Sequence, residues 1–104
     1  MQLLCLAAME PPSRFEPGAV RDEKLKVIRA LDPVLPGEIA RGQYRADRAV
    51  GSYRDHAGNP DSVTESLIAM KVQVSNWRWA GTPFYVRTGK KLRRRMSEIA
   101  IIFR

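Results

Sequence analysis

The alternation of apolar and polar residues just after Thr64 is the feature that most restricts the fold of this chain. Ile68, Met70, Val72 and Val74 fall on one side of an extended backbone, and the residues between them fall on the other. A period of two is typical of a strand with one buried face. We therefore predict a strand here that lies in a sheet covered on one side.

The first third of the chain has the periodicity of helices instead. The apolar run 3–9 is typical of the buried end of a helix, which Pro11 and Pro12 end because proline lacks the amide donor. A second, amphipathic helix is predicted from Val20 to Leu31, since acidic residues lie near its start and basic residues near its end. The sequence thus predicts two helical segments before any strand.

Three further strands are expected, at 38–44, 84–87 and 99–103, with a loop from Arg45 to Asp61 that is rich in Gly, Asp, Arg and Pro. Two helices followed by about four strands, without β-α-β alternation, predict an α+β fold with a mainly antiparallel sheet. The 104 residues suffice for one small domain. Because the chain opens on an apolar helix end and closes on an apolar strand, we expect it to be part of a larger sheet in a longer parent protein.

Cysteine usage and hydropathy restrict the protein class. Cys5 is the only cysteine, so the chain can form no internal disulfide and no cysteine-based zinc site. We expect Cys5 to be a packing residue in a reduced, cytoplasmic protein. The opening apolar run lacks the basic flank of a signal peptide, and no stretch approaches the roughly 20 apolar residues of a membrane span.

Positive charge is concentrated in one segment, residues 87–95, which we call the basic cluster. Six of its nine residues are Lys or Arg, whereas the rest of the chain has twelve bases against eleven acids. Gly89 lets the backbone approach an anion closely, and Lys90 with Arg95 could bind a phosphate or phosphosugar. A solvated basic loop and a nucleic-acid-binding module remain alternatives. Four aromatic residues precede the cluster and are expected to pack in the core, although they could stack on bases: Trp77, Trp79, Phe84 and Tyr85.

Other residues with catalytic chemistry give weaker signals. His56 is the only histidine and lies in a polar loop, so we do not expect a base or metal ligand there. Asp22 and Glu23 are interpreted as first-turn carboxylates of the second helix. Neither a G-x-G-x-x-G fingerprint nor a P-loop occurs. Taken alone, the residues indicate an anion site without catalytic apparatus.

Several segments, in this order and spacing, resemble glucose-6-phosphate dehydrogenase. They are Leu4-Cys5-Leu6-Ala7-Ala8-Met9-Glu10-Pro11-Pro12, Val20-Arg21-Asp22-Glu23-Lys24-Leu25-Lys26-Val27, Arg41-Gly42-Gln43-Tyr44, Asn76-Trp77-Arg78-Trp79-Ala80-Gly81 and Pro83-Phe84-Tyr85-Val86-Arg87-Thr88-Gly89-Lys90. The resemblance covers this chain nearly from end to end, but only an internal part of the family's length.

The resemblance implies a cytoplasmic enzyme of the oxidative pentose phosphate pathway, which oxidises glucose 6-phosphate to 6-phosphogluconolactone with NADP. It implies that residues 1–104 are a fragment of the second, β+α domain, and that the Rossmann domain, which binds most of the NADP, is absent. Lys90 and Arg95 match the positions that line the sugar-phosphate site. The parent is then a homodimer or homotetramer, with no membrane or nucleic-acid partner.

The resemblance places no catalytic or cofactor-binding residue and no metal in this chain. By matching positions the family's histidine base lies just upstream of Met1, and His56 does not occupy its place. We therefore expect the isolated chain to be inactive, because the reaction needs a base and a bound nicotinamide. Animal members hold a second, structural NADP with basic residues where this chain has Met96 and Ala100, so we expect no structural NADP here.

Overall fold

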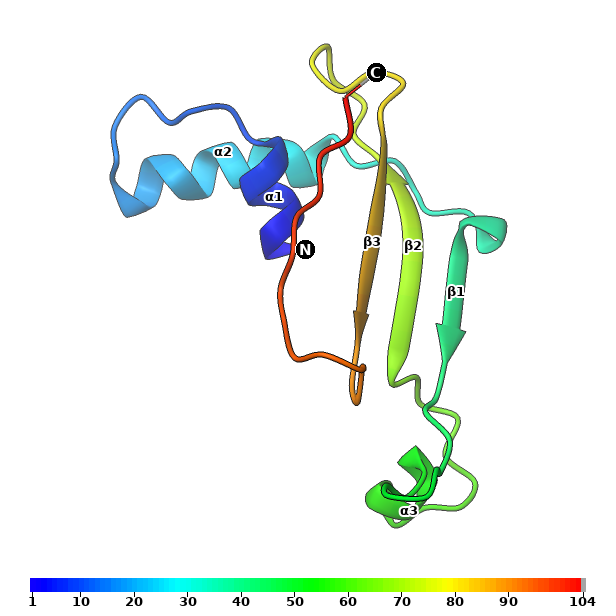
Figure 1. Cartoon of the computed structure of the whole chain (residues 1–104). Helices are drawn as coiled ribbons and strands as arrows, with labels where there is room; N and C mark the ends of the chain where they lie inside the picture. Colours follow the sequence, from blue (N-terminus) through cyan, green and yellow to red (C-terminus); the bar gives the residue numbers. More distant parts are fainter. Residues whose placement is uncertain (104) are drawn as a thin grey trace.

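The two N-terminal helices lie at one end of a three-stranded sheet, and a short third helix lies at the other end, in the computed structural model, which describes residues 1–103 (Figure 1). The elements, in chain order, are α1 (Gln2–Ala8), α2 (Pro17–Arg29), the 3-10 turn η1 (Pro36–Glu38), β1 (Ile39–Gly42), α3 (Tyr53–Ala57), β2 (Leu67–Gln73) and β3 (Pro83–Gly89). Both predicted helices are present. Helix α2 begins three residues earlier than expected, because Pro17 sits at its start, where a missing amide hydrogen does no harm.

The sheet is antiparallel throughout, in the order β1-β2-β3. Strand β2, the segment with the clearest alternation, is the central strand. Gly42 of β1 pairs with Leu67 of β2, which in turn pairs with Gly89 of β3. The three strands therefore reach the same level at the end of the sheet that lies away from α1 and α2. The α+β class and the antiparallel sheet are confirmed.

Two expectations about local structure are wrong. Residues 99–103 form no strand; the segment runs back alongside the sheet without joining its ladder, and Ile102 is 91% exposed (Figure 1). The described part of the chain therefore has three strands rather than about four, since an alternating pattern becomes a strand only where a partner edge is available. The expected loop 45–61 contains α3, whose five residues are too few to show a helical period.

The core is small and joins the helices to β2. Cys5 and Ala8 of α1 pack with Val27 of α2 and with Val74, which directly follows β2. Cys5 is 2% exposed, so its expected packing role is confirmed. Trp79 and Phe84 pack against this cluster with their rings edge to face, and their centroids are 5.1 Å apart.

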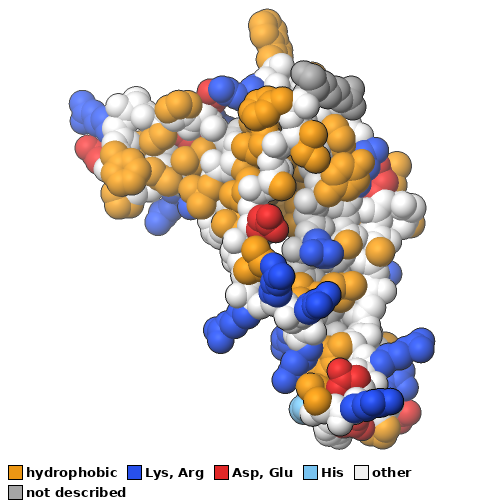
Figure 2. All heavy atoms as spheres, viewed as in Figure 1, with side chains coloured by type: hydrophobic (Ala, Val, Ile, Leu, Met, Phe, Trp, Pro, Cys, Tyr) orange, Lys and Arg blue, Asp and Glu red, His pale blue; other side chains and the backbone are white. Residues whose placement is uncertain are grey.

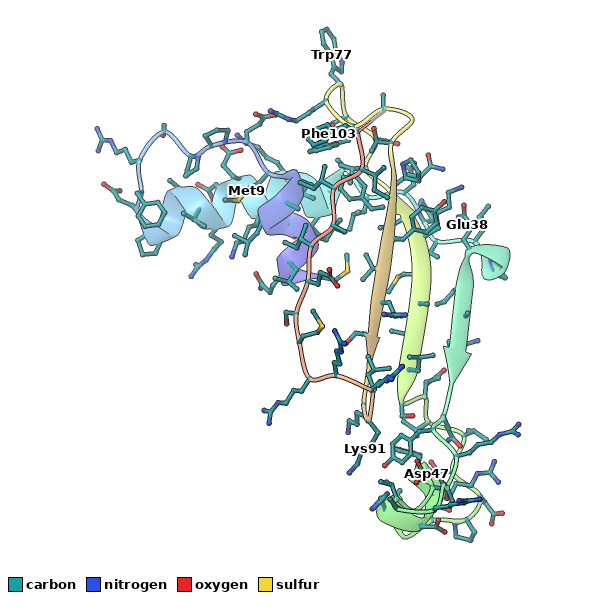
Figure 3. All side chains as sticks on the ribbon, viewed as in Figure 1. Met9, Glu38, Asp47, Trp77, Lys91 and Phe103 are labelled. Carbon is teal, nitrogen blue, oxygen red and sulfur yellow. The ribbon has the colours of Figure 1, made fainter. Side chains whose placement is uncertain are left out.

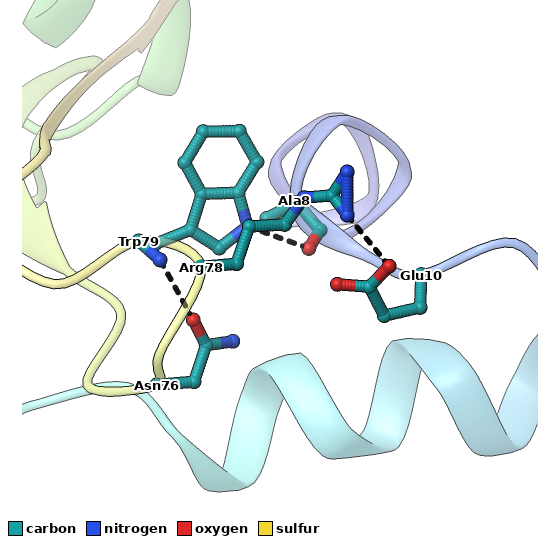
Figure 4. Close-up of polar contacts among 5 residues, drawn as sticks. All are labelled: Ala8, Glu10, Asn76, Arg78 and Trp79. Carbon is teal, nitrogen blue, oxygen red and sulfur yellow. Dashed lines mark hydrogen bonds and ion pairs between the residues drawn. The ribbon is translucent and has the colours of Figure 1, made fainter.

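The loop between β2 and β3 is tied to the end of α1 by polar contacts (Figure 4). The indole Nε1 of Trp79 donates to the carbonyl of Ala8 at 2.8 Å, and the Trp79 amide donates to Asn76 Oδ1 at 2.9 Å. Arg78 pairs with Glu10 at 2.6 Å. The predicted packing of aromatic residues is therefore right for Trp79 and Phe84. It is wrong for Trp77 and Tyr85, which are fully and 78% exposed.

The molecule is elongated, with principal extents of 50 × 32 × 27 Å. Helix α3 lies beyond the end of the sheet opposite to α1 and α2 (Figure 1). Within residues 1–103, no helix is both long enough and apolar enough to span a membrane.

Candidate anion-binding site

Lys90 directly follows β3 and leaves the sheet at the end nearest α3. Its amide donates to the carbonyl of Ser66 at 2.7 Å, a short contact that continues the β2–β3 ladder by one residue. Lys91 then has a φ of 55°, in the left-handed region that non-glycine residues rarely adopt. The backbone of Lys90 is therefore fixed to the sheet immediately before the chain turns away.

Gly89 is needed here for close approach. A Cβ at this position would lie 2.8 Å from Leu67 Cδ1 and 3.2 Å from the carbonyl oxygen of Ser66. Its φ is not in the positive region, and the unusual backbone angle of the turn falls on Lys91 instead. The expected reason for Gly89 thus changes: the glycine lets β3 lie close to Leu67 and Ser66.

The basic cluster has no charge partners within residues 1–103. Four ion pairs are present, and none involves a residue between 87 and 95. All six basic side chains of the cluster belong to exposed residues. Figure 2 shows Lys and Arg side chains gathered around the lower half of the molecule, and Figure 3 places Lys91 at the lower end of β3. The uncompensated charge there attracts anions.

The two residues predicted to bind phosphate, Lys90 and Arg95, lie in different structural environments. Lys90 is attached to the sheet through its amide, whereas Arg95 lies in an exposed segment without regular structure. No hydrogen bond or ion pair links the two side chains in the described residues. Two open hollows, of about 460 and 410 Å³, are lined by other residues, the first between α1 and the start of α2 and the second beside Arg41 and Glu65. The joint action of Lys90 and Arg95 on a phosphate stays a prediction.

His56 is an exposed residue of α3 whose imidazole makes two polar contacts. Its Nδ1 lies 3.0 Å from the carbonyl oxygen of Ser52 and 3.2 Å from the hydroxyl of Tyr44. Because a carbonyl oxygen only accepts, Nδ1 must carry a proton. Tyr44 also packs edge to face on Tyr53, with ring centroids 5.7 Å apart. These contacts tie α3 to the chain that follows β1.

The carboxylates of Asp22 and Glu23 lie on α2 but beyond its first turn, because the helix begins at Pro17; the interpretation of both as first-turn residues is therefore wrong. Glu23 pairs with Lys26 three residues on, at 2.7 Å. This hydrogen bond is the main reason why the pKa of Lys26 is raised, followed by the charge of Glu23. The carboxylate of Glu23 thus has a local partner on its own helix.

Ser66 is the residue at this end of the sheet that the sequence did not single out. It is 6% exposed, and no motif or periodicity marks it, since it precedes a strand in a run of polar residues. Its significance lies in contacts with residues far away in the chain, which no sequence pattern shows.

Comparison with known proteins identifies the family. The family model described as glucose-6-phosphate dehydrogenase, C-terminal domain, matches residues 1–104. Glucose-6-phosphate 1-dehydrogenase of Mycolicibacterium smegmatis is 47% identical over all of this chain, which covers 23% of that protein. The enzyme of Rhizobium meliloti is 49% identical with the same coverage. The chain therefore spans about a quarter of the length of these relatives.

Solved structures agree with the sequence match. Glucose-6-phosphate 1-dehydrogenase from Mycobacterium avium superimposes with a TM-score of 0.73 at 39% identity, over 85% of this chain and 18% of that one. A glucose-6-phosphate dehydrogenase in complex with its substrate glucose 6-phosphate gives a TM-score of 0.74 at 37% identity, over 85% and 19%. By sequence and by fold, this chain belongs to the family of glucose-6-phosphate dehydrogenase C-terminal domains.

Proposed function

We propose that this chain is part of an oxidoreductase that oxidises glucose 6-phosphate to 6-phosphogluconolactone with NADP, and that Lys90 and Arg95 bind the phosphate of the sugar. The relatives named above support the reaction class, and one solved relative is described with glucose 6-phosphate as its substrate. We place the enzyme in the cytoplasm, in the oxidative pentose phosphate pathway, as a homodimer or homotetramer.

The observation that carries the proposal is the uncompensated basic cluster, within which the backbone of Lys90 is fixed to the sheet. A sugar phosphate presents a compact anion with several oxygen acceptors. Lys supplies a mobile point charge, and the Arg fork can bind two oxygens at once. Lys90, with an anchored backbone, defines the place of binding, and Arg95 adds a second contact from the loop.

The described residues do not fit the NADP that the family implies. A dinucleotide pyrophosphate is usually bound at the Gly-rich turn of a parallel β-α-β unit. The sheet here is antiparallel throughout residues 1–103, and the sequence has no such fingerprint. We assign the cofactor and the proton-accepting base to parts of the enzyme outside these 104 residues, with a Rossmann domain as the cofactor's site.

Replacing Lys90 by Ala tests the proposal in a complete dehydrogenase that carries residues 1–104, for example a chimera with the M. smegmatis enzyme. We expect KM for glucose 6-phosphate to rise by about 10- to 100-fold, because a charged hydrogen bond contributes roughly 1.5–3 kcal/mol. KM for NADP should change by less than about twofold. If the contact strengthens in the transition state, kcat falls as well.

Arg14→Ala is the matched control, since it removes the same unit of charge from an exposed loop between α1 and α2. It should leave both KM values unchanged. An unaltered KM for glucose 6-phosphate in Lys90→Ala would remove Lys90 from the site. Equal effects of Lys90→Ala and Arg14→Ala on this KM would show that Lys90 acts only through the net positive charge of the protein.

A further inference from the structure

We propose that Ser66 is a positioning residue for Lys90, setting where the lysine meets the phosphate of the sugar. The inference rests on the proposed function, because it assigns a role to Ser66 through the binding role of Lys90. Ser66 itself does not touch the substrate in this proposal.

Three hydrogen bonds converge on Ser66. Its amide donates to the carbonyl of Gly42 at 2.9 Å, and its carbonyl accepts from the Lys90 amide at 2.7 Å. Its hydroxyl oxygen accepts from the Tyr44 amide at 3.0 Å. One residue therefore joins the chain after β1 to the chain after β3, and it is the only buried polar side chain in the described part of the molecule.

The position of Ser66 in the sheet explains why these contacts matter at Lys90. Gly42, Leu67 and Gly89 are paired at one level, and Ser66 lies one residue beyond them. After Lys90 the backbone turns away through Lys91. The carbonyl of Ser66 is thus the last acceptor that holds the end of β3 before residues 91–95 of the basic cluster leave the sheet.

Gly89 allows the approach. A Cβ at Gly89 would lie 2.8 Å from Leu67 Cδ1, whereas one at Gly42 would make only an ordinary contact, 4.0 Å from Leu67 Cδ2. The Leu67 side chain therefore occupies the space over both neighbouring strands. This packing brings the neighbouring strands close to the carbonyl and hydroxyl of Ser66. The backbone of Lys90 is therefore held by the residue that directly precedes β2.

Loss of the Ser66 hydroxyl would leave the Tyr44 amide without an acceptor. An amide that loses its partner away from water destabilises the local structure. Tyr44 also contacts Tyr53 and His56, so its release would loosen the whole connection after β1. Ser66 would then hold Lys90 less firmly, and the long lysine side chain would have to be ordered at the moment of binding.

Steady-state kinetics of Ser66→Ala in the complete dehydrogenase test the inference. We expect KM for glucose 6-phosphate to rise by about five- to tenfold, the equivalent of one ordinary hydrogen bond. KM for NADP should stay within about twofold. Ser66→Thr keeps the hydroxyl and should restore the KM for glucose 6-phosphate.

Ser75→Ala is the matched control at the other end of β2, where the Ser75 hydroxyl donates to Asp32 at 2.7 Å. It removes one serine hydrogen bond far from Lys90 and should leave both KM values unchanged. The proposal would be overturned if Ser66→Ala and Ser75→Ala lost thermal stability to the same extent and raised both KM values to the same extent. Ser66 would then have a structural role alone.

Hydrogen exchange of the peptide that spans residues 84–92 gives a second readout, independent of activity. Ser66→Ala should speed exchange of the Lys90 amide by about tenfold, and Ser75→Ala should not change it. If Lys90→Ala weakens glucose 6-phosphate binding while Ser66→Ala alters neither KM nor exchange, the inference is wrong and the proposed function stands. If Lys90→Ala leaves KM unchanged, the proposed function itself is wrong.

Discussion

Trp77 and Trp79 are two residues apart and have opposite environments. The indole of Trp79 packs on the core cluster and donates to Ala8, whereas Trp77 is fully exposed at the tip of the same loop (Figures 3 and 4). Only one of the two side chains can face α1, because the loop is fixed by Asn76 and by the Arg78–Glu10 pair. The residue that faces the helix supplies both apolar contact and a hydrogen bond.

Trp79→Phe should lower the free energy of unfolding by about 1–3 kcal/mol, since the Ala8 carbonyl loses a donor in a partly buried place. Trp77→Phe should change it by less than about 0.5 kcal/mol. Urea unfolding followed by circular dichroism measures both without relying on tryptophan fluorescence. Equal losses in the two variants would contradict this assignment.

At the scale of elements, α3 is stabilised by its own end residues. Ser52 caps the helix, and Asp55 Oδ2 accepts from both the hydroxyl and the amide of Ser52 at 2.7 Å. Gly58 ends the helix with a φ of 61°. This capping box and terminal glycine are sequence signals. They could have predicted a helical turn inside the segment interpreted as loop.

The pKa of Asp55 is lowered from its ordinary value of 3.8, first by the hydrogen bond from the Ser52 hydroxyl and then by the Ser52 amide. A carboxyl with a depressed folded pKa adds stability that is present above 3.8 and is lost as pH falls through the folded value. We therefore predict that α3 frays below about pH 4. The Ser52 amide resonance in an NMR pH titration measures this.

Asp55→Asn should remove that acid-dependent step from the Ser52 resonance. Asp47→Asn is the control, because the pKa of Asp47 is also lowered, by the amides of Ala49 and Val50, but its bonds lie outside α3. An acid step that survives in Asp55→Asn would show that another group controls the helix.

Strands form only where they pair with another strand, whereas α3 is stabilised by residues at its own ends. Strand β2 was predicted from its alternation, and it pairs with a neighbour on each side. Val72 is buried on the predicted apolar face, as is Val74 just beyond the strand, whereas residues 67–71 are half-buried on both faces. Residues 99–103 alternate as well, yet they form no ladder in the described chain. Ile99, Ile101 and Phe103 are 52%, 69% and 87% exposed. Alternation predicts which face a strand would bury. Whether the segment forms a strand depends on a free strand edge, in another part of the chain, with which its backbone can pair.

At the scale of the whole molecule, the chain is less compact than its length allows. Its radius of gyration is 17.2 Å, against about 13 Å for a globular domain of this size. Within residues 1–103 the buried apolar core consists of six residues, Leu4, Cys5, Ala8, Val27, Val72 and Val74. A core of this size offsets little of the conformational entropy lost on folding.

We therefore predict that the isolated 104-residue chain unfolds at a lower denaturant concentration than the same segment inside a complete dehydrogenase. Hydrogen exchange of the β2 peptide at increasing urea measures both proteins on the same residues. Equal midpoints would show that the helix–sheet contacts suffice on their own.

The isolated chain should also fail to reduce NADP in the presence of glucose 6-phosphate. The described sheet has no nucleotide-binding unit, and the resemblance locates the base outside the chain. The assay follows absorbance at 340 nm, a standard wavelength for NADPH, with the complete dehydrogenase as positive control. Reduction that depends on glucose 6-phosphate and on the purified chain would refute our assignment of these parts.

The sequence by itself determined α1, α2, the central strand and the dense positive charge after Gly89, because period, proline position and charge are local properties. Only the tertiary structure decided which tryptophan is buried and which residue holds Lys90. The Trp79–Ala8 bond spans 71 residues of the chain, and the strands that meet at Ser66 are joined by loops of many residues. Such contacts depend on how elements pack against each other, and no local pattern of residues records that.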